Sequence, residues 1–506
     1  MTAATARVRA LRVATALDRR YGTTAFVVVL MLASLALRST QLKAGFWIDE
    51  GISVGIAHHH WTSIPHLLRQ DGSPPAYYML LGLWIRVFGD SERATHALSL
   101  IFALGCIPLG YAAARSLFDR RTALVCAAIV AFDPFLTYYG QETRMYAMEA
   151  FLSLLVALAY VKGVLRGEKA WAGLLVLATA LMVYTHNWGL FLCLALAVTT
   201  VLLARERLRL FALVAAGVAI LYLPWVPTVL SQVRHTGAPW SQAPSFHELF
   251  LAPGAVLGGD APFVALVLAA AAGIALTAGR TERSLAAIVA VTVVSAWVGS
   301  QISPAWTTRY FSVVLGPTVV LAAATVVRAR RLGWVALVVV LFLWWGYTLK
   351  DEKENAREVA AQIAPTMHPG ELVISTHPEQ VPVLRYYLGS GLRFATTLGP
   401  VPDSQVFDWR DAVQRLKAAR PQPTLDALLA TVPRGGEFVV VSPVFRDYRA
   451  WDATWTHLVW RRSIAWTALL QRDPHLRLER HVVTDEIAVK RNYFKPLQAF
   501  VYRKLS

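Results

Sequence analysis

Long apolar runs recur from about residue 22 to about residue 349, and they constrain this chain more than any other feature. A membrane-spanning helix needs roughly 20 consecutive apolar residues, because each backbone polar group inside a bilayer must be hydrogen-bonded within the protein. Of the 506 residues, 56% are hydrophobic and only 16% are charged, which is unusual for a soluble domain. The sequence therefore predicts a polytopic α-helical membrane protein.

About eleven transmembrane helices are expected. They lie near 22–41, 93–114, 122–139, 143–163, 170–186, 188–204, 209–227, 261–278, 284–300, 311–328 and 332–349. Together they make up a transmembrane domain over 22–349, and residues 1–21 form a basic leader before it. The leader runs into a segment long enough to remain a span, so we expect no cleavable signal peptide.

One apolar stretch, 76–89, is ambiguous because its length of about 14 residues is short for a span. Its Tyr, Trp and Arg content is typical of a helix that lies in the membrane interface. With an interfacial helix here and a cytoplasmic N-terminus, the loops rich in Lys and Arg fall in the cytoplasm, whereas a spanning helix would place them outside. We therefore expect a plasma-membrane protein with a cytoplasmic N-terminus and a long external loop over 42–92.

The net charge of +17 has the same explanation. In a soluble protein such an excess would indicate nucleic-acid binding, but here much of it falls in short loops between spans, where it sets orientation. We expect no nucleic-acid partner. The three cysteines lie within apolar runs and predict neither a disulfide framework nor a metal site.

The tail after the last span has a different pattern. A charged run at 349–358 marks a boundary, and strand-like and helix-like stretches then alternate. These stretches are 371–376 and 437–443 for strands, and 378–389, 408–420 and 455–471 for helices. The alternation predicts a soluble α/β domain over 350–506, which the derived topology places outside the membrane.

Two adjacent carboxylates, Asp49 and Glu50, follow the first apolar run directly. They could be ordinary surface charge. However, they are embedded in Gly-Phe-Trp-Ile-Asp-Glu-Gly, and a carboxylate that is partly desolvated by apolar neighbours becomes a better general base.

Four further residues on the expected external side have a structural and a functional interpretation. Asp71 could form an Asx turn, and Tyr77 could be an interfacial anchor. Glu142 and Arg144 could be a surface ion pair or the floor of a pocket.

Two residues at the outer ends of spans are also candidates. His186 could cap a helix or take part in catalysis, and Arg309 could be a membrane anchor or a phosphate clamp. The run His58-His59-His60 has the wrong spacing for one metal ion. Convergence of all these side chains on one membrane face favours a shared site.

The ordered motifs resemble those of GT-C fold glycosyltransferases of family 39 type, the dolichyl-phosphate-mannose protein mannosyltransferase and aminoarabinose transferase group. They are Asp-Glu at 49–50, Asp-x-x-Pro-Pro-x-Tyr-Tyr at 71–78, Phe-Gly-Asp-Ser-Glu-Arg-Ala-Thr-His at 88–96 and Gly-Gln-Glu-Thr-Arg-Met-Tyr at 140–146. The resemblance covers about residues 20–320 and is strongest over 45–150.

The resemblance implies an inverting transfer of a sugar, of mannose type by analogy, from a polyprenyl-phosphate donor at the external face. The acceptor would be a protein, a glycolipid or a polysaccharide. Asp49 matches the family's catalytic acidic residue, which would act as the general base, and Glu50 matches its neighbour. Asp71 and Tyr77 match the second loop motif, and the third motif contributes Glu142, Arg144 and Tyr146. Arg309 would contact phosphate by position only.

No cofactor is expected, although Asp49, Glu50 and Asp71 could together ligate a divalent cation. Two other classes of function remain open. A lipid-linked sugar transporter or flippase would need no chemistry, and it should show broken helices in paired halves. A sensor or scaffold would use the tail as its working part, and the loop carboxylates would then be dispensable.

Overall fold

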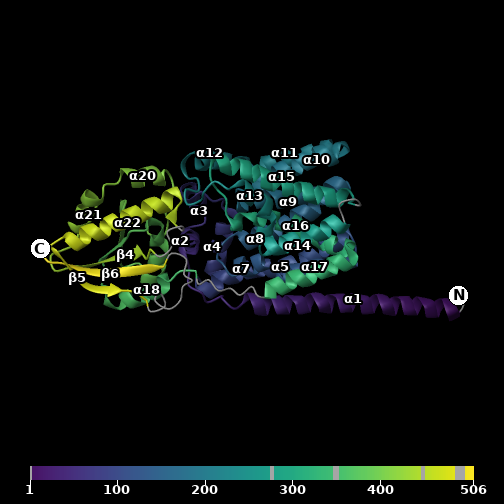
Figure 1. The fold of residues 1–506 in the computed structure, drawn as a ribbon, viewed down its shortest axis with the longest axis horizontal. Helices are drawn as coiled ribbons and strands as arrows, with labels where there is room; N and C mark the ends of the chain where they lie inside the picture. The colour runs from purple at the N-terminus through teal and green to yellow at the C-terminus, as the bar shows by residue number, and fades with distance from the viewer. Residues whose placement is uncertain (1–2, 274–277, 346–352, 446–450, 485–495) are drawn as a thin grey trace.

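The computed structural model of the protein describes residues 3–273, 278–345, 353–445, 451–484 and 496–506. A bundle of roughly parallel helices occupies one half of the molecule and a mixed α/β domain the other, with the short helices α2, α3 and α4 between them (Figure 1). A helical membrane protein with a carboxyl-terminal sheet domain is therefore confirmed.

Each of the eleven ranges predicted as spans overlaps an α-helix. The bundle helices are α1 (Ala3–Arg38), α5 (Glu92–Leu117), α6 (Arg120–Phe132), α7 (Pro134–Tyr139), α8 (Tyr146–Tyr160), α9 (Lys169–Thr185), α10 (Gly189–Leu203), α11 (Leu208–Tyr222), α12 (Val226–His235), α13 (Phe246–Leu251), α14 (Asp260–Gly273), α15 (Arg280–Ile302), α16 (Ser312–Arg328) and α17 (Arg330–Trp345). By length and apolarity, six helical segments within the described residues could cross a membrane, or seven if one bent pair is a single span. The total of eleven spans stays a prediction.

Close helix contact in the bundle depends on small residues. Gly316 of α16 lies directly against the backbone of Ser153 and Leu154 in α8, so a Cβ there would collide with it. The Gly316 N–H also donates to Ser153 Oγ at 2.8 Å. Small residues are enriched where transmembrane helices approach closely, since lipid provides no hydrophobic force between them.

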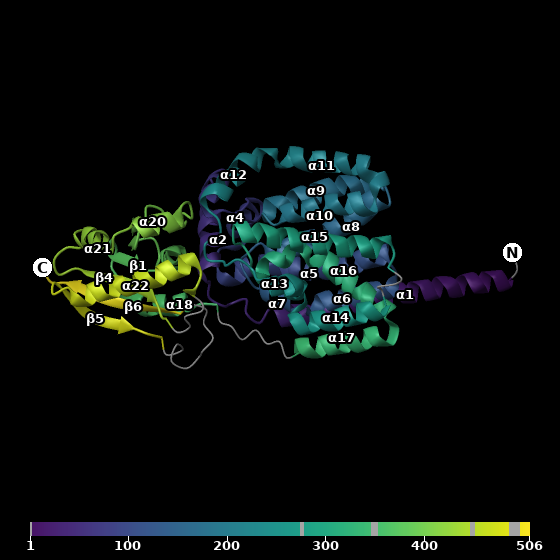
Figure 2. The same ribbon diagram turned by 45° about the horizontal axis from the view of Figure 1, so that its top comes forward.

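The predicted external loop contains α2 (Ile48–His58), α3 (Ile64–Asp71) and α4 (Ala76–Phe88). The range 76–89, expected as a short interfacial helix, does form the 13-residue α4. Figure 2 places α2 and α4 at the junction with the α/β domain. This junction is where the main cavity lies.

The α/β domain contains a six-stranded sheet in the order β3-β2-β1-β4-β6-β5. Strand β1 pairs parallel with both β2 and β4. Strand β3 pairs antiparallel with β2, and β6 pairs antiparallel with both β4 and β5. The strands are β1 (Leu372–Ser375), β2 (Arg393–Thr396), β3 (Gly399–Pro400), β4 (Glu437–Pro443), β5 (Leu476–Val482) and β6 (Leu497–Lys504). The helices are α18 (Ala356–Ile363), α19 (Val381–Leu388), α20 (Ala412–Ala418), α21 (Pro421–Leu429) and α22 (Thr454–Arg472).

Strands β1 and β4 and helices α19 and α22 occupy ranges that the sequence predicted. The predicted helix 408–420 is shorter, because Asp411 has a positive φ of 49° just before α20 begins. Four strands, β2, β3, β5 and β6, and two helices, α18 and α21, were not predicted from the sequence. β5 is largely exposed along its length, so it has no apolar pattern that would reveal it.

Candidate active site

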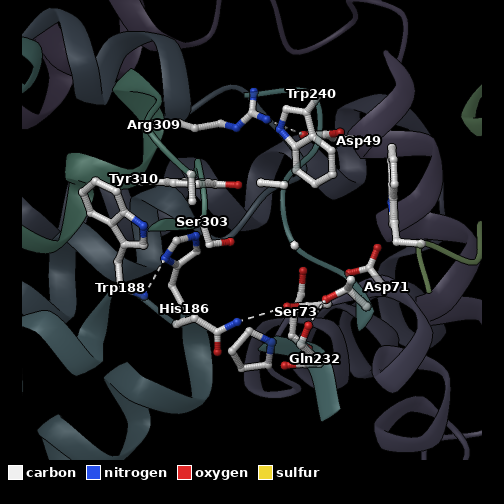
Figure 3. A pocket seen from close by; sticks show the side chains of 18 of the residues that line it. Asp49, Asp71, Ser73, His186, Trp188, Gln232, Trp240, Ser303, Arg309 and Tyr310 are labelled. Carbon is white, nitrogen blue, oxygen red and sulfur yellow. Dashed lines mark hydrogen bonds and ion pairs between the residues drawn. The ribbon is translucent and has the colours of Figure 1, made fainter. Parts of the chain in front are cut away.

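A cavity of about 470 Å³ lies where the bundle, the α2–α4 segment and the α/β domain meet (Figure 3). Five of the nine predicted site residues line it, and they come from five separate parts of the chain: Asp49, Asp71, Arg144, His186 and Arg309. The expected convergence of these residues on one pocket therefore agrees with the geometry.

Asp49 lies in the first turn of α2 and is partly open to the cavity, with 20% of its side chain exposed. Its Oδ2 is 3.5 Å from Nη2 of Arg309 and 3.8 Å from Nη2 of Arg144. One carboxylate thus faces two guanidinium groups, which leaves an excess of positive charge beside it. Such an arrangement can bind an anion and keep a base close to it.

The two arginines are fixed from behind. Arg144 Nη1 donates to Ser53 Oγ at 2.8 Å and to the Asp49 carbonyl at 3.2 Å. The Arg309 guanidinium lies 5.4 Å from the centre of the Trp47 ring, within cation–π range. Their planar donor groups are therefore held in defined positions.

Asp71 and His186 line another part of the wall (Figure 3). Asp71 ends α3, where Gly72 takes a positive φ of 98°. Burial raises the pKa of Asp71 despite hydrogen bonds from Ser73 and Tyr78. His186 follows α9 directly and caps it, and its unprotonated Nδ1 accepts a hydrogen bond from the Trp188 N–H at 3.2 Å. His186 is therefore a neutral imidazole near neutral pH.

Glu50 points away from the cavity, although it is adjacent to Asp49. Its side chain is fully buried, and its Oε1 lies 2.7 Å from Lys353 Nζ, from His96 Nε2 and from the Thr143 backbone nitrogen. Burial alone would raise the pKa of Glu50, but the charges of Lys353 and His96 outweigh it and lower the pKa to about 2. Glu50 is thus ionised, and both of its carboxylate oxygens accept hydrogen bonds from neighbouring residues.

Lys353 lies in the charged run at 349–358, which the sequence indicated only as a domain boundary. No periodicity or motif marks it, since its partner Glu50 is 303 residues away. His96 ends the motif at 88–96, but no feature of the sequence distinguished it from the other residues of that motif. The predicted domain boundary instead supplies a buried side chain to the site region.

Glu142, Tyr77 and Tyr146 lie behind the cavity wall. All three are buried, so the alternatives of an exposed Glu142–Arg144 ion pair and an interfacial Tyr77 anchor are wrong. Tyr146 supports Arg144, whose Cζ lies 5.7 Å from its ring centre. Burial raises the pKa of Glu142 to about 7, although Lys353 and Arg309 act in the opposite direction.

The rest of the lining is mixed. The α/β domain contributes Glu379, Trp409 and Thr456, which the sequence did not connect with the site. Apolar side chains from two helices form another part of the wall: Leu190 and Phe191 from α10, and Val229 and Val233 from α12. The cavity thus combines charged groups with an apolar wall.

Within the described ranges, no group of three or more His, Cys, Asp and Glu side chains could hold a metal ion. The candidate ligand set of Asp49, Glu50 and Asp71 does not assemble, because Glu50 faces Lys353 instead. The histidine run is also divided among different partners, since His58 binds Asp90 and His59 binds Asp403.

A family model described as dolichyl-phosphate-mannose-protein mannosyltransferase matches residues 72–230. A search of curated protein sequences gave no match. Among solved structures, ArnT from Cupriavidus metallidurans in the apo state has a TM-score of 0.61 at 15% identity, over 96% of this chain and 98% of that one. The same protein bound to undecaprenyl phosphate has a TM-score of 0.62 at 15% identity, over 95% and 97%.

An oligosaccharyltransferase from Archaeoglobus fulgidus in the apo form is more distant. It has a TM-score of 0.52 at 14% identity, over 84% of this chain and 70% of that one. At these identities the structures establish the fold, and the family model is consistent with them over 72–230. The chain therefore has the GT-C fold, and over residues 72–230 it is similar to the mannosyltransferase family.

Proposed function

We propose that the protein is a membrane glycosyltransferase that moves a sugar from a polyprenyl-phosphate donor to an acceptor hydroxyl, with Asp49 as the general base. The observation that carries this proposal is the partly exposed Asp49 carboxylate beside Arg144 and Arg309 in one cavity. The matched family description names dolichyl-phosphate-mannose, and the similar ArnT structure holds undecaprenyl phosphate.

The two arginines would bind the donor phosphate, because a guanidinium offers a rigid fork of donors to phosphate oxygens. Their charge would stabilise the phosphate as it leaves with the electron pair of the broken bond to the anomeric carbon. Lys353 is committed to Glu50 and would take no part in this contact.

Asp49 would accept the proton of the acceptor hydroxyl while its oxygen attacks the anomeric carbon. Attack from the face opposite the phosphate inverts that carbon. Donor phosphate would take over part of the Asp49 contacts with the arginines and so free the carboxylate. Asp71 and the neutral His186 would form hydrogen bonds with sugar hydroxyls. Tyr77, Glu142 and Tyr146 would support the wall behind Arg144.

The apolar wall fits a lipid-linked donor. Leu190, Phe191, Val229 and Val233 provide a hydrophobic surface beside the charged groups, as a polyprenyl chain attached to phosphate requires. We propose a mannose-type sugar and a protein, glycolipid or polysaccharide acceptor. The reaction would occur at the external face of the plasma membrane, with the N-terminus cytoplasmic and the α/β domain outside.

A flippase without chemistry is the alternative. The described residues do contain one bent helix pair, Phe246–Leu257 with Asp260–Ala271, at 95°. A transporter built from repeats would have a second bent helix pair at the corresponding place in its other half. The described residues contain one such pair.

Deletion of the gene tests the proposal. The lipid-linked sugar that accumulates in the deletion strain identifies the donor, and the wild-type gene should remove it. Asp49→Asn should be made in normal amounts but fail to consume that lipid, with transfer reduced about 10²–10⁴-fold. Asp426→Asn, on the exposed face of α21, is the matched control and should behave as wild type.

Transfer by Asp49→Asn at a near-normal rate would refute the role of Asp49. A deletion strain in which no polyprenyl-phosphate sugar accumulates would refute the donor class. A flippase would be recognised by a third pattern, in which the donor accumulates on one membrane face and Asp49→Asn restores its movement.

A further inference from the structure

The α/β domain provides one buried cation to the helix that carries Asp49. Lys353 lies three residues before α18 and is 4% exposed at its side chain. Its Nζ donates to Glu50 Oε1 at 2.7 Å and to the Gln141 carbonyl at 2.9 Å, and it lies 3.2 Å from His96 Nε2. Lys353 is thus buried among residues of α2, α5 and the segment before α8.

Glu50 ties the first turn of α2 to three other parts of the chain. Its Oε1 accepts from the Thr143 N–H and from Lys353, and its Oε2 accepts from the Trp47 N–H at 3.3 Å. Asp49 is the preceding residue in the same turn. Any tilt of that turn would therefore move the Asp49 carboxylate relative to Arg144 and Arg309.

The same domain also packs directly on α2. A Cβ on Gly51 would lie 2.6 Å from the Val383 side chain in α19, and a Cβ on Gly55 would run into the Gln405 carbonyl. Gly51 and Gly55 are one helical turn apart and so share a face of α2. The helix is therefore clamped between this domain and the bundle.

We propose that Lys353 is a positioning residue for Asp49: by neutralising Glu50 it fixes the first turn of α2, which makes the α/β domain a working part of the active site. The inference rests on the proposed function, because it assigns Asp49 as the base. Lys353 itself touches no substrate in this scheme. Without Lys353, the buried Glu50 carboxylate keeps only His96 and the Thr143 and Trp47 N–H groups as partners, and α2 would shift in response to the lost charge compensation.

The test uses the full-length enzyme in lipid nanodiscs. The donor is the polyprenyl-phosphate sugar isolated from the deletion strain, and membranes of that strain supply the acceptor. Lys353→Met should lower kcat about 100-fold while KM stays within about threefold, because a displacement of about 1 Å at a catalytic group costs on this order. Lys417→Met, an exposed lysine in α20, is the matched control and should keep wild-type kinetics.

A double variant separates positioning from general damage. If Lys353 acts through Glu50, the variant Glu50→Gln with Lys353→Met should be no slower than the slower single variant. Losses that multiply, or a Lys353→Met enzyme with kcat within threefold of wild type, would overturn the proposal. A rise in KM alone would overturn it as well.

If Lys353→Met alone does not fold, size-exclusion chromatography of the double variant decides the matter. Folding restored by Glu50→Gln supports the coupling, since the unpaired charge has been removed, whereas a double variant that is also unfolded refutes it. These outcomes are distinct from failure of the proposed function, which would appear as normal transfer by Asp49→Asn.

Discussion

Glu142 provides a quantitative test of the electrostatics around the site. Its side chain is 1% exposed, and no hydrogen-bond partner for either carboxylate oxygen is found among the described residues. Burial raises the pKa of Glu142 from 4.5 to about 7. The cations Lys353 and Arg309 act to lower this pKa, but the nearby carboxylates Glu50 and Asp49 act to raise it and so offset them. The ionised form is thus disfavoured in the folded protein.

The magnitude follows from linkage. A pKa higher in the folded state than in the unfolded state means that the folded state binds its proton more tightly. Below pH 4.5 both states are protonated and the group has no net effect. Above pH 7 both are ionised, and folding then carries the full cost of the buried charge of Glu142, about 3 kcal/mol at 1.36 kcal/mol for each pH unit. Glu142 therefore makes the wild-type protein progressively less stable as the pH rises from 4.5 to 7.

Glu142→Gln keeps the shape of the side chain and removes the charge. The variant should be more stable than wild type by up to about 3 kcal/mol at pH 8 and nearly equal to it at pH 4.5. Equilibrium unfolding in mixed micelles at several pH values measures the difference. Glu168→Gln is the control, because this residue lies in a surface pair with Lys162 and is 41% exposed. It should change stability by less than about 1 kcal/mol at every pH. A Glu142→Gln effect that is destabilising, or that does not depend on pH, would refute the reasoning.

Two further substitutions test the phosphate contact and the clamp on α2. Arg309→Lys keeps the charge but loses the planar fork over Trp47, so kcat/KM should fall about 10–100-fold in the donor-consumption assay; an unchanged value would exclude Arg309 from phosphate binding. Gly55→Ala places a methyl group against the Gln405 carbonyl and should destabilise the protein by about 1–3 kcal/mol in thermal unfolding. Gly173→Ala is the control and should not destabilise the protein, because a Cβ there meets no atom within 4 Å. Equal unfolding midpoints for the two variants would contradict the packing argument.

The apolar pattern of the sequence was enough to place the long apolar helices of the bundle, but not the shorter α12 and α13. Burial in a bilayer requires long uninterrupted apolar segments, so each segment reports its own position without information from the rest of the chain. The same holds for β1 and β4, whose buried residues form short apolar runs. The exposed β5 shows the limit of such patterns, since pairing with β6 and not burial places it in the sheet.

Within the site, the sequence indicated Asp49, Asp71, Arg144, His186 and Arg309 through their chemistry and expected side of the membrane. The local chemistry of the two residues does not separate Asp49 from Glu50, and only the family resemblance favours Asp49 as the base. Successive residues in a helix point about 100° apart, so one carboxylate faces the cavity and the other faces the bundle. Which of them is buried depends on how α2 is rotated.

That rotation is set by residues far away in the chain. Lys353, Val383 and Gln405 come from the connection and the α/β domain, and they hold α2 through a buried charge and two close backbone contacts. Local sequence determined which segments are helices and which residues carry reactive groups. The tertiary structure alone decided which of two adjacent acids faces the cavity, because partners hundreds of residues apart leave no periodic trace in the sequence.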